Sequence, residues 1–127
     1  QTMSPSGRAL RVAGTVLLAS GTILGAFGAH ALKSRLPVDR YEVLQTAVHY
    51  QFIHALGLLL MGIAAERFAS PLLRSAGAWL LAGVLLFSGS LYLILAGAPH
   101  WLGVITPLGG LALIVGWLLA AWVFVRN

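Results

Sequence analysis

Four long apolar runs constrain the fold of this 127-residue chain more than any other feature. Residues 12–31, 43–65, 75–98 and 101–125 contain no Asp, Glu, Lys or Arg. A helix needs about 20 mostly apolar residues to cross a hydrocarbon core of about 30 Å. Charged residues make up 9% of the chain, whereas a soluble domain carries about 25%. The sequence therefore predicts an all-α integral membrane bundle of four transmembrane helices.

Proline and cap residues mark where these helices begin. Pro37 suits a first helical position, where its missing N–H costs nothing. Ser70-Pro71 and Thr106-Pro107 are each typical of an N-cap followed by a first helical residue, so the fourth helix is expected to be regular only from Pro107, after an irregular entry. The first run is long enough to span a bilayer, and we expect a retained span rather than a signal peptide. The expected spans are roughly 9–32, 38–67, 71–96 and 102–126, in one domain over 1–127.

The basic residues predict an orientation. The net charge is +5, from eight basic and three acidic residues. The basic residues flank the apolar runs, where they contact lipid headgroups and set topology rather than bind nucleic acid. Four spans place both termini on one side, with Arg8, Arg11, Arg67, Arg74 and Arg126, and leave Lys33, Arg35 and Arg40 on the other. This excess predicts that both termini are cytoplasmic.

Small residues recur every seven positions along two spans. The first span has Gly7, Gly14, Gly21 and Gly28, and the third has Ala76, Gly83, Ser90 and Gly97. A seven-residue interval keeps one face toward a partner helix in a left-handed bundle, and small residues let two backbones approach closely. We therefore expect these faces to form the closest helix contacts.

Polar residues within the spans form the candidate ligand or proton site. An unpaired polar group in hydrocarbon costs several kcal/mol, so we expect the polar residues of the second span to face other helices. The alternative interpretation is that they are structural and bond only from helix to helix. The candidate residues are Thr46, His49, Tyr50, Gln51 and His54 of the second span, with His30, Ser88, Ser90 and Tyr92 as partners by depth.

The same residues do not predict a metal centre or a catalytic constellation. All four histidines lie toward one side of the membrane, which would suit a metal or proton site. His49 and His54, however, are not the i, i+4 pair of a helical metal site. The chain has no cysteine, no Gly-x-Ser-x-Gly elbow and no phosphate-binding glycine loop. We predict no metal, no cofactor and no enzymatic activity.

Several separated motifs carry a resemblance. They are GAFGAHALK at 25–33, TAVHYQ at 46–51 with HAL at 54–56, FSGSLY at 87–92, and TPLGG at 106–110 with GW at 116–117. With these motifs the chain resembles the YgdD-like family of small four-span membrane proteins (domain of unknown function 423). The resemblance implies an integral protein of bacterial inner membranes, and it implies no activity.

Three classes of function remain open. The first is a non-enzymatic accessory or structural subunit that binds lipids or partner membrane proteins, within a larger complex or a homo-oligomer; short loops and small-residue faces favour it. The second is an oligomeric carrier or channel for a small solute or proton, using the polar residues of the second span. The third is an intramembrane enzyme or cofactor site. A haem, for example, would need two histidines at similar depth on facing helices, and only the second span has deep ones.

Overall fold

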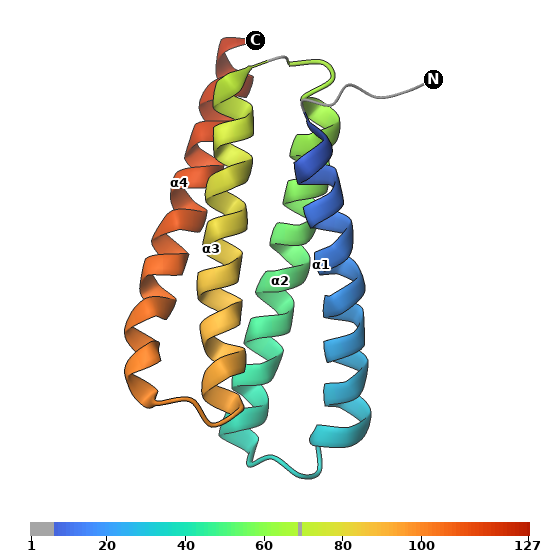
Figure 1. Ribbon diagram of the computed structural model, residues 1–127, viewed down its shortest axis with the longest axis vertical. Helices are drawn as coiled ribbons and strands as arrows, with labels where there is room; N and C mark the ends of the chain where they lie inside the picture. The colour runs from blue at the N-terminus through green and yellow to red at the C-terminus, as the bar shows by residue number, and fades with distance from the viewer. Residues whose placement is uncertain (1–6, 69) are drawn as a thin grey trace.

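The structure, a computed structural model, describes residues 7–68 and 70–127, and in these ranges it consists of helices joined by short turns. The four long helices are each apolar enough to cross a membrane when their short extensions are included, so the predicted fold class is confirmed. Figure 1 shows them as two hairpins. The elements in chain order are α1 (Arg8–Phe27), the π-helical turn η2 (Gly28–Leu32), α2 (Val38–Ala64), α3 (Pro71–Leu95), the 3-10 turn η3 (His100–Val104) and α4 (Ile105–Arg126).

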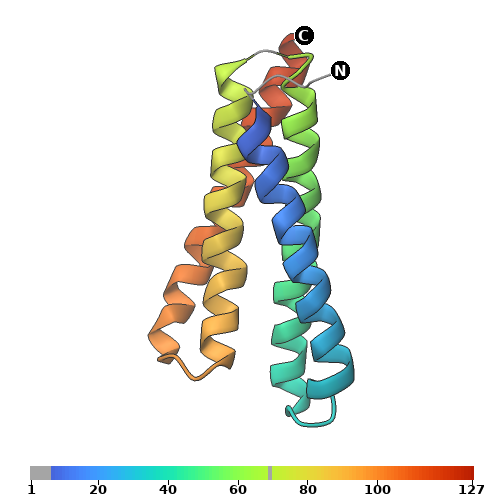
Figure 2. The ribbon, with the colours of Figure 1, turned by 45° about the vertical axis from the view of Figure 1, so that its right-hand side comes forward.

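The central pair of helices is α2 and α3, with α1 packed on α2 and α4 packed on α3 (Figure 1). Arg8 and Arg126 lie at one end of the bundle, here called the terminal end. The 33–37 and 96–99 connections lie at the other, the loop end. Figure 2 shows that the two hairpins diverge toward the loop end. The main buried core lies in the terminal half, around Leu58, Leu73 and Leu80. Outside this core lie the buried polar side chains of the described residues, Gln51, His54, Ser88 and Ser90.

The beginnings of the helices follow local chemistry. Ser70 caps α3 by accepting a hydrogen bond from Leu72 N at 3.2 Å, and Pro71 is the first helical residue, as predicted. Pro37 is the N-cap of α2, one position ahead of where we expected it. The helical part of α2 ends at Ala64 rather than near residue 67. The backbone N–H groups of Arg67 and Phe68 both donate to the Ala64 carbonyl, which closes a turn after the helix.

The entry to α4 corrects one prediction. The irregular segment is the 3-10 turn η3, and α4 already begins at Ile105. Pro107 lies in the first turn, where an N–H has no intrahelical partner and its absence costs nothing. Thr106 does not cap the helix; its Oγ1 instead meets Ser90 Oγ of α3 at 2.5 Å. The prediction that Thr106 is an N-cap and Pro107 the first helical residue is therefore wrong.

The glycine face of α1 lies directly on α2, as the seven-residue interval predicted. A Cβ added at Gly14 would lie 2.7 Å from the Ala55 carbonyl oxygen, closer than real Cβ atoms come. At Gly28 an added Cβ would lie 2.7 Å from Leu44 Cδ2. At Gly21 it would lie 3.3 Å from the Gln51 amide nitrogen. Glycine at these positions brings the α1 backbone within contact of α2.

The small residues of α3 and α4 pack on each other in the same way. An added Cβ would lie 2.7 Å from Leu113 Cδ2 at Gly83 and 2.5 Å from Phe87 N at Gly109. The prediction for Gly97 is wrong, because no neighbouring atom lies within 4 Å of an added Cβ there. Gly97 follows α3 with a φ of 106°, a left-handed conformation that glycine adopts without steric cost.

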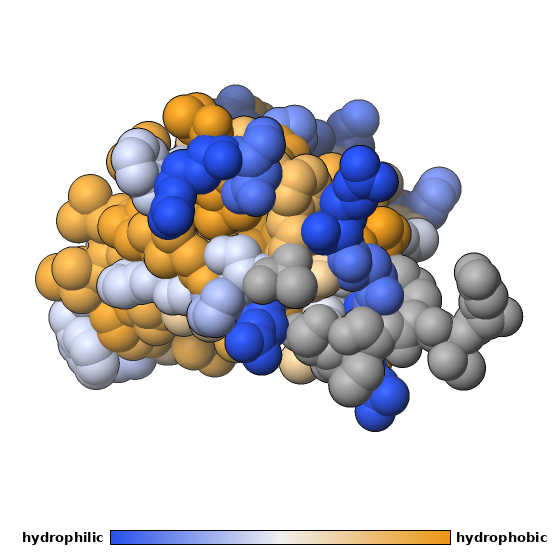
Figure 3. Space-filling view, turned by 90° about the horizontal axis from the view of Figure 1, so that it is seen from above, coloured by the Kyte–Doolittle hydropathy of each residue, from blue (hydrophilic) through white to orange (hydrophobic). Residues whose placement is uncertain are grey.

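Two arginines tie the helices together at opposite ends of the bundle. At the terminal end, Arg11 donates to the Gly62 carbonyl at 2.9 Å and pairs with Glu66 at 3.5 Å. At the loop end, Arg40 of α2 donates to the Leu95 carbonyl at 3.1 Å and so satisfies the last turn of α3. Figure 3, a view onto the terminal end, shows hydrophilic side chains over the helix ends and hydrophobic side chains along the flanks. This distribution fits helices that cross a bilayer.

Candidate functional site

The polar residues of α2 divide into an inner set and an outer set. Gln51 and His54 are only 3% and 5% exposed, and Tyr50 is 37% exposed. Thr46 and His49 are exposed to the surroundings of the bundle. The prediction that all five face other helices is therefore wrong for Thr46 and His49. Successive side chains are about 100° apart, so polar residues at these positions surround α2, whereas neighbouring helices cover only part of it.

Gln51 joins three helices. Its Nε2 donates to the Leu17 carbonyl and to Ser20 Oγ of α1, both at 2.9 Å. Its Oε1 accepts a hydrogen bond from the Tyr92 hydroxyl of α3 at 2.6 Å. Gly21 leaves room for this amide against α1. Both amide donors are thus used, which is the bonding expected of a structural residue.

Ser20 is a member of this network that the sequence reasoning missed. Its position next to Gly21, at the edge of the α1 contact face, was the signal that could have identified it. A small cavity of about 230 Å³ adjoins the network. Its lining includes Ser20, Gln51, Ser88 and Tyr92.

The two predicted serines of α3 bond in different directions. Ser88 Oγ donates to the Ala47 carbonyl of α2 at 2.7 Å, in a fully buried position. Ser90 Oγ donates back to the Phe87 carbonyl at 2.9 Å and meets Thr106 of α4. Ser88 therefore holds α3 to α2, and Ser90 lies on the small-residue contact between α3 and α4. Both have the geometry of packing residues.

His54 lies in an aromatic cluster between α2, α3 and α4. Its Nδ1–H donates to the Tyr50 carbonyl one turn earlier, at 2.7 Å. Its ring is stacked with Tyr50 at 5.7 Å between centroids and lies 5.8 Å from Trp117 of α4. Tyr50 in turn stacks on Phe87 of α3 at 4.3 Å. These rings line a groove of about 480 Å³, here called the α2–α4 groove, which consists of Tyr50, His54, Phe87, Pro107, Gly110, Leu111, Leu113, Ile114 and Trp117.

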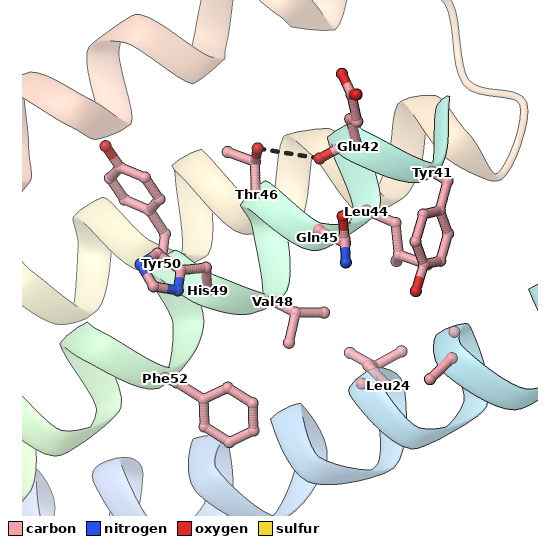
Figure 4. A pocket seen from close by; sticks show the side chains of 13 residues that line it. Leu24, Tyr41, Glu42, Leu44, Gln45, Thr46, Val48, His49, Tyr50 and Phe52 are labelled. Atoms are coloured by element: carbon pink, nitrogen blue, oxygen red, sulfur yellow. Dashed lines mark hydrogen bonds between the residues drawn. The ribbon is translucent and has the colours of Figure 1, made fainter. Parts of the chain in front are cut away.

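The outer set borders a larger groove of about 690 Å³ along α1, η2 and α2, here called the α1–α2 groove. Figure 4 shows Val48 and Phe52 pointing toward α1, with Glu42 and Thr46 on the opposite edge of α2. Thr46 Oγ1 donates to the Glu42 carbonyl at 3.0 Å. The groove is lined by Leu24, Gly25, Gly28, Ala29, Tyr41, Glu42, Leu44, Gln45, Thr46, Val48, His49, Tyr50 and Phe52.

The outer residues lie at different depths. At 1.5 Å per residue, His49 lies about 14 Å deeper along α2 than Arg40, well inside the hydrocarbon layer. His49 and Gln45 make no hydrogen bond within the described residues. His30, in the π-helical turn η2, is exposed at the loop end, and within the described residues it makes no hydrogen bond or ring contact with the other candidates. No group of three His, Cys, Asp or Glu side chains that could hold a metal ion occurs in residues 7–68 and 70–127.

Helices, grooves and interhelical polar bonds together define a small four-helix integral membrane protein. Residues 24–110 match the family described as "Protein of unknown function (DUF423)". The chain belongs to this family.

Relatives are found in several bacteria. The "UPF0382 membrane protein YwdK" of Bacillus subtilis is 43% identical over 104 residues, which cover 81% of this chain and 83% of the relative. The "UPF0382 inner membrane protein YgdD" of Escherichia coli is 35% identical over 96 residues, covering 76% and 73%. A "UPF0382 membrane protein" of Staphylococcus haemolyticus is 44% identical over 95 residues, covering 75% and 77%. No solved structure matches the chain.

Proposed function

We propose that the protein is a non-enzymatic accessory or structural subunit of a larger complex in the cell inner membrane, with both termini in the cytoplasm. Its partner is a transmembrane helix of another protein, which occupies the α1–α2 groove. The observation that carries this proposal is the outward position of His49, an imidazole at hydrocarbon depth with no hydrogen bond within the described residues.

The cost of leaving His49 in contact with lipid supports a protein partner. An unpaired polar group in hydrocarbon costs several kcal/mol. Gln45 lies one turn away, on the same side of α2, and its amide also makes no hydrogen bond within the described part of the chain. A partner helix that carries a hydroxyl or amide at this depth would bond to both side chains.

The composition of the groove supports the same partner. Gly25 and Ala29 line the side of the groove formed by α1 and η2, and an added Cβ at Gly25 would make only ordinary contacts, at 3.5 Å or more. Small residues that admit a neighbouring backbone, beside polar side chains that bond across helices, are typical of transmembrane helix interfaces. The π-helical turn η2 ends α1 at this groove; such turns occur frequently at functional sites.

The inner polar residues give less support to the second candidate, an oligomeric carrier or channel. The Gln51 amide, Tyr92 and Ser88 bond to one another or to backbone carbonyls. A solute would have to break these bonds to pass, and hydrogen-bonded chains that end on backbone carbonyls of α1 and α2 do not relay a proton across the bundle. Gln45 and His49, which make no hydrogen bond within the described residues, are on the outside of the bundle.

Site-specific photo-crosslinking tests the proposal. A photoreactive benzoylphenylalanine replaces Ile53, which is 44% exposed and lies one turn from His49. The matched control carries it at Leu60, a more exposed position in the terminal half of α2. We expect one defined protein adduct from position 53, absent from position 60 and lost when His49→Leu is added.

The other outcomes are equally specific. An adduct with a second copy of the chain would replace the accessory role with a homo-oligomer. Adducts with lipid alone at position 53, or a protein adduct indifferent to His49→Leu, would refute the proposal.

A further inference from the structure

The α2–α4 groove contains a buried acceptor that the helix bundle does not use. His54 is 5% exposed, and its Nδ1–H is donated to the Tyr50 carbonyl. A carbonyl oxygen only accepts, so Nδ1 carries the proton and Nε2 of the neutral ring carries a lone pair. Nε2 has no hydrogen-bond partner within residues 7–68 and 70–127. It is also not sealed from the groove, since no fully buried polar side-chain atom of the described residues lacks a partner.

The position of this nitrogen limits what can bond to it. His54 is the central residue of the uncharged stretch 43–65. At 1.5 Å per residue it lies about 17 Å from either end of that stretch, near the middle of a hydrocarbon core of about 30 Å. Water and lipid headgroups do not reach this depth, and an acyl chain has no donor. A bonding partner must therefore be soluble in the bilayer and carry its own O–H or N–H.

The walls of the groove indicate the shape of that partner. Tyr50, Phe87 and Trp117 present aromatic rings around His54, and aromatic rings prefer to stack with other flat rings. The volume of about 480 Å³ lies within the range of small-molecule sites, about 300–1,000 Å³. Gly110 has no side chain to occupy the groove, and the nearest atom to a Cβ added there would be Phe87 Cδ2, at 3.9 Å. Space for a ligand therefore remains beside Gly110.

We propose that the α2–α4 groove binds a lipid-soluble phenol or hydroquinone, with its ring among Tyr50, Phe87 and Trp117 and its hydroxyl donating to Nε2 of His54. The ligand enters laterally from the bilayer, since Leu111 and Ile114 on the rim are exposed. The two grooves share Tyr50 and are otherwise lined by different residues, so this proposal does not depend on the proposed partner helix.

Fluorescence quenching tests the proposal with a pair of probes. Trp117 is kept as the single tryptophan by Trp79→Phe, Trp101→Phe and Trp122→Phe, and the protein is placed in phosphatidylcholine nanodiscs. The probe is 4-bromo-4′-hydroxybiphenyl, whose bromine quenches indole fluorescence. Its methyl ether has the same rings but no donor. We expect saturable quenching by the phenol with an affinity about tenfold above that of the ether, the effect of one hydrogen bond.

Two substitutions locate the binding. His54→Phe keeps an aromatic ring and should remove the difference between phenol and ether. Ile114→Phe fills the groove from its exposed rim and should weaken binding of both probes without altering the core. Leu118→Phe, one turn further along α4 and 65% exposed, is the matched control and should change nothing.

Several results would overturn the proposal. One is equal affinity for phenol and ether in the unaltered groove. Another is quenching that only follows partition of the probes into the bilayer, without saturation. If His54→Phe fails to fold, as judged by circular dichroism, the Ile114→Phe and Leu118→Phe pair decides the question, and equal binding by both would refute the site.

Discussion

The bond between Gln51 and Tyr92 allows a direct measurement of what holds the two hairpins together. Tyr92→Phe removes the hydroxyl that donates to Gln51 Oε1 at 2.6 Å and keeps the ring. Interhelical hydrogen bonds in a membrane contribute about 0.6 kcal/mol on average and at most about 1.7 kcal/mol. We expect Tyr92→Phe to lower the free energy of unfolding by an amount in this range.

Gln51→Met extends the measurement to the whole network. Methionine has a similar length but makes none of the bonds to Leu17, Ser20 and Tyr92. With each bond contributing about 0.6 kcal/mol, the expected loss is about 2 kcal/mol. The double variant should be less destabilised than the sum of the single ones, because both remove the same bond.

Reversible unfolding of the protein from mixed micelles by sodium dodecyl sulfate, followed by tryptophan fluorescence, supplies these free energies. Tyr50→Phe is the matched control, since the Tyr50 hydroxyl makes no hydrogen bond within the described residues, and it should leave stability unchanged. Strict additivity of Gln51→Met and Tyr92→Phe would show that the two side chains do not interact. The structural interpretation of this network would then be wrong.

Three further predictions address packing, topology and the loop end. Gly14→Leu should destabilise the bundle by about 1–3 kcal/mol through overpacking, whereas Gly89→Ala, with open space at its added Cβ, should cost nothing in the same assay; equal losses would contradict the packing argument. The chain has no cysteine, so single cysteines at Ser34 and Asn127 can be labelled with a membrane-impermeant maleimide in spheroplasts; labelling of the second before the first would reverse the proposed orientation. Arg40→Met should cost about 1 kcal/mol by removing the donor to the last turn of α3, and an unchanged unfolding curve would show that this bond contributes nothing.

The fold could be predicted from the sequence because the long uncharged runs that indicate it are a physical requirement for crossing a bilayer. Runs without charge have to be helical in hydrocarbon, since only a helix satisfies all its backbone groups within one segment. The glycines of α1 also predicted a contact face correctly. The same seven-residue interval failed at Gly97, because the helix ends before it and a turn needs glycine there for a different reason.

The candidate site could be predicted from the sequence only in part. The sequence shows on which side of α2 a residue lies, but not how much of that helix its neighbours cover. Gln51 and His54 proved to be enclosed, whereas Thr46 and His49 face outward. The depth of a polar residue follows from its position along the helix, but its partners depend on where the other helices pack. The sequence did not predict that Ser20 belongs to the Gln51 network, because its bond to Gln51 depends on how α1 packs on α2.

The position of Gln51 has a consequence for how the chain enters the membrane. Its helix, α2, is the least hydrophobic of the four spans, so α2 is the span least able to partition into lipid by itself. The two amide donors of Gln51 bond to α1, which is made earlier, and its acceptor bonds to α3, which is made later. We therefore expect α1 and α2 to leave the translocation machinery as a preformed hairpin. Gln51 Oε1 then has no partner until α3 enters the membrane and supplies the Tyr92 hydroxyl.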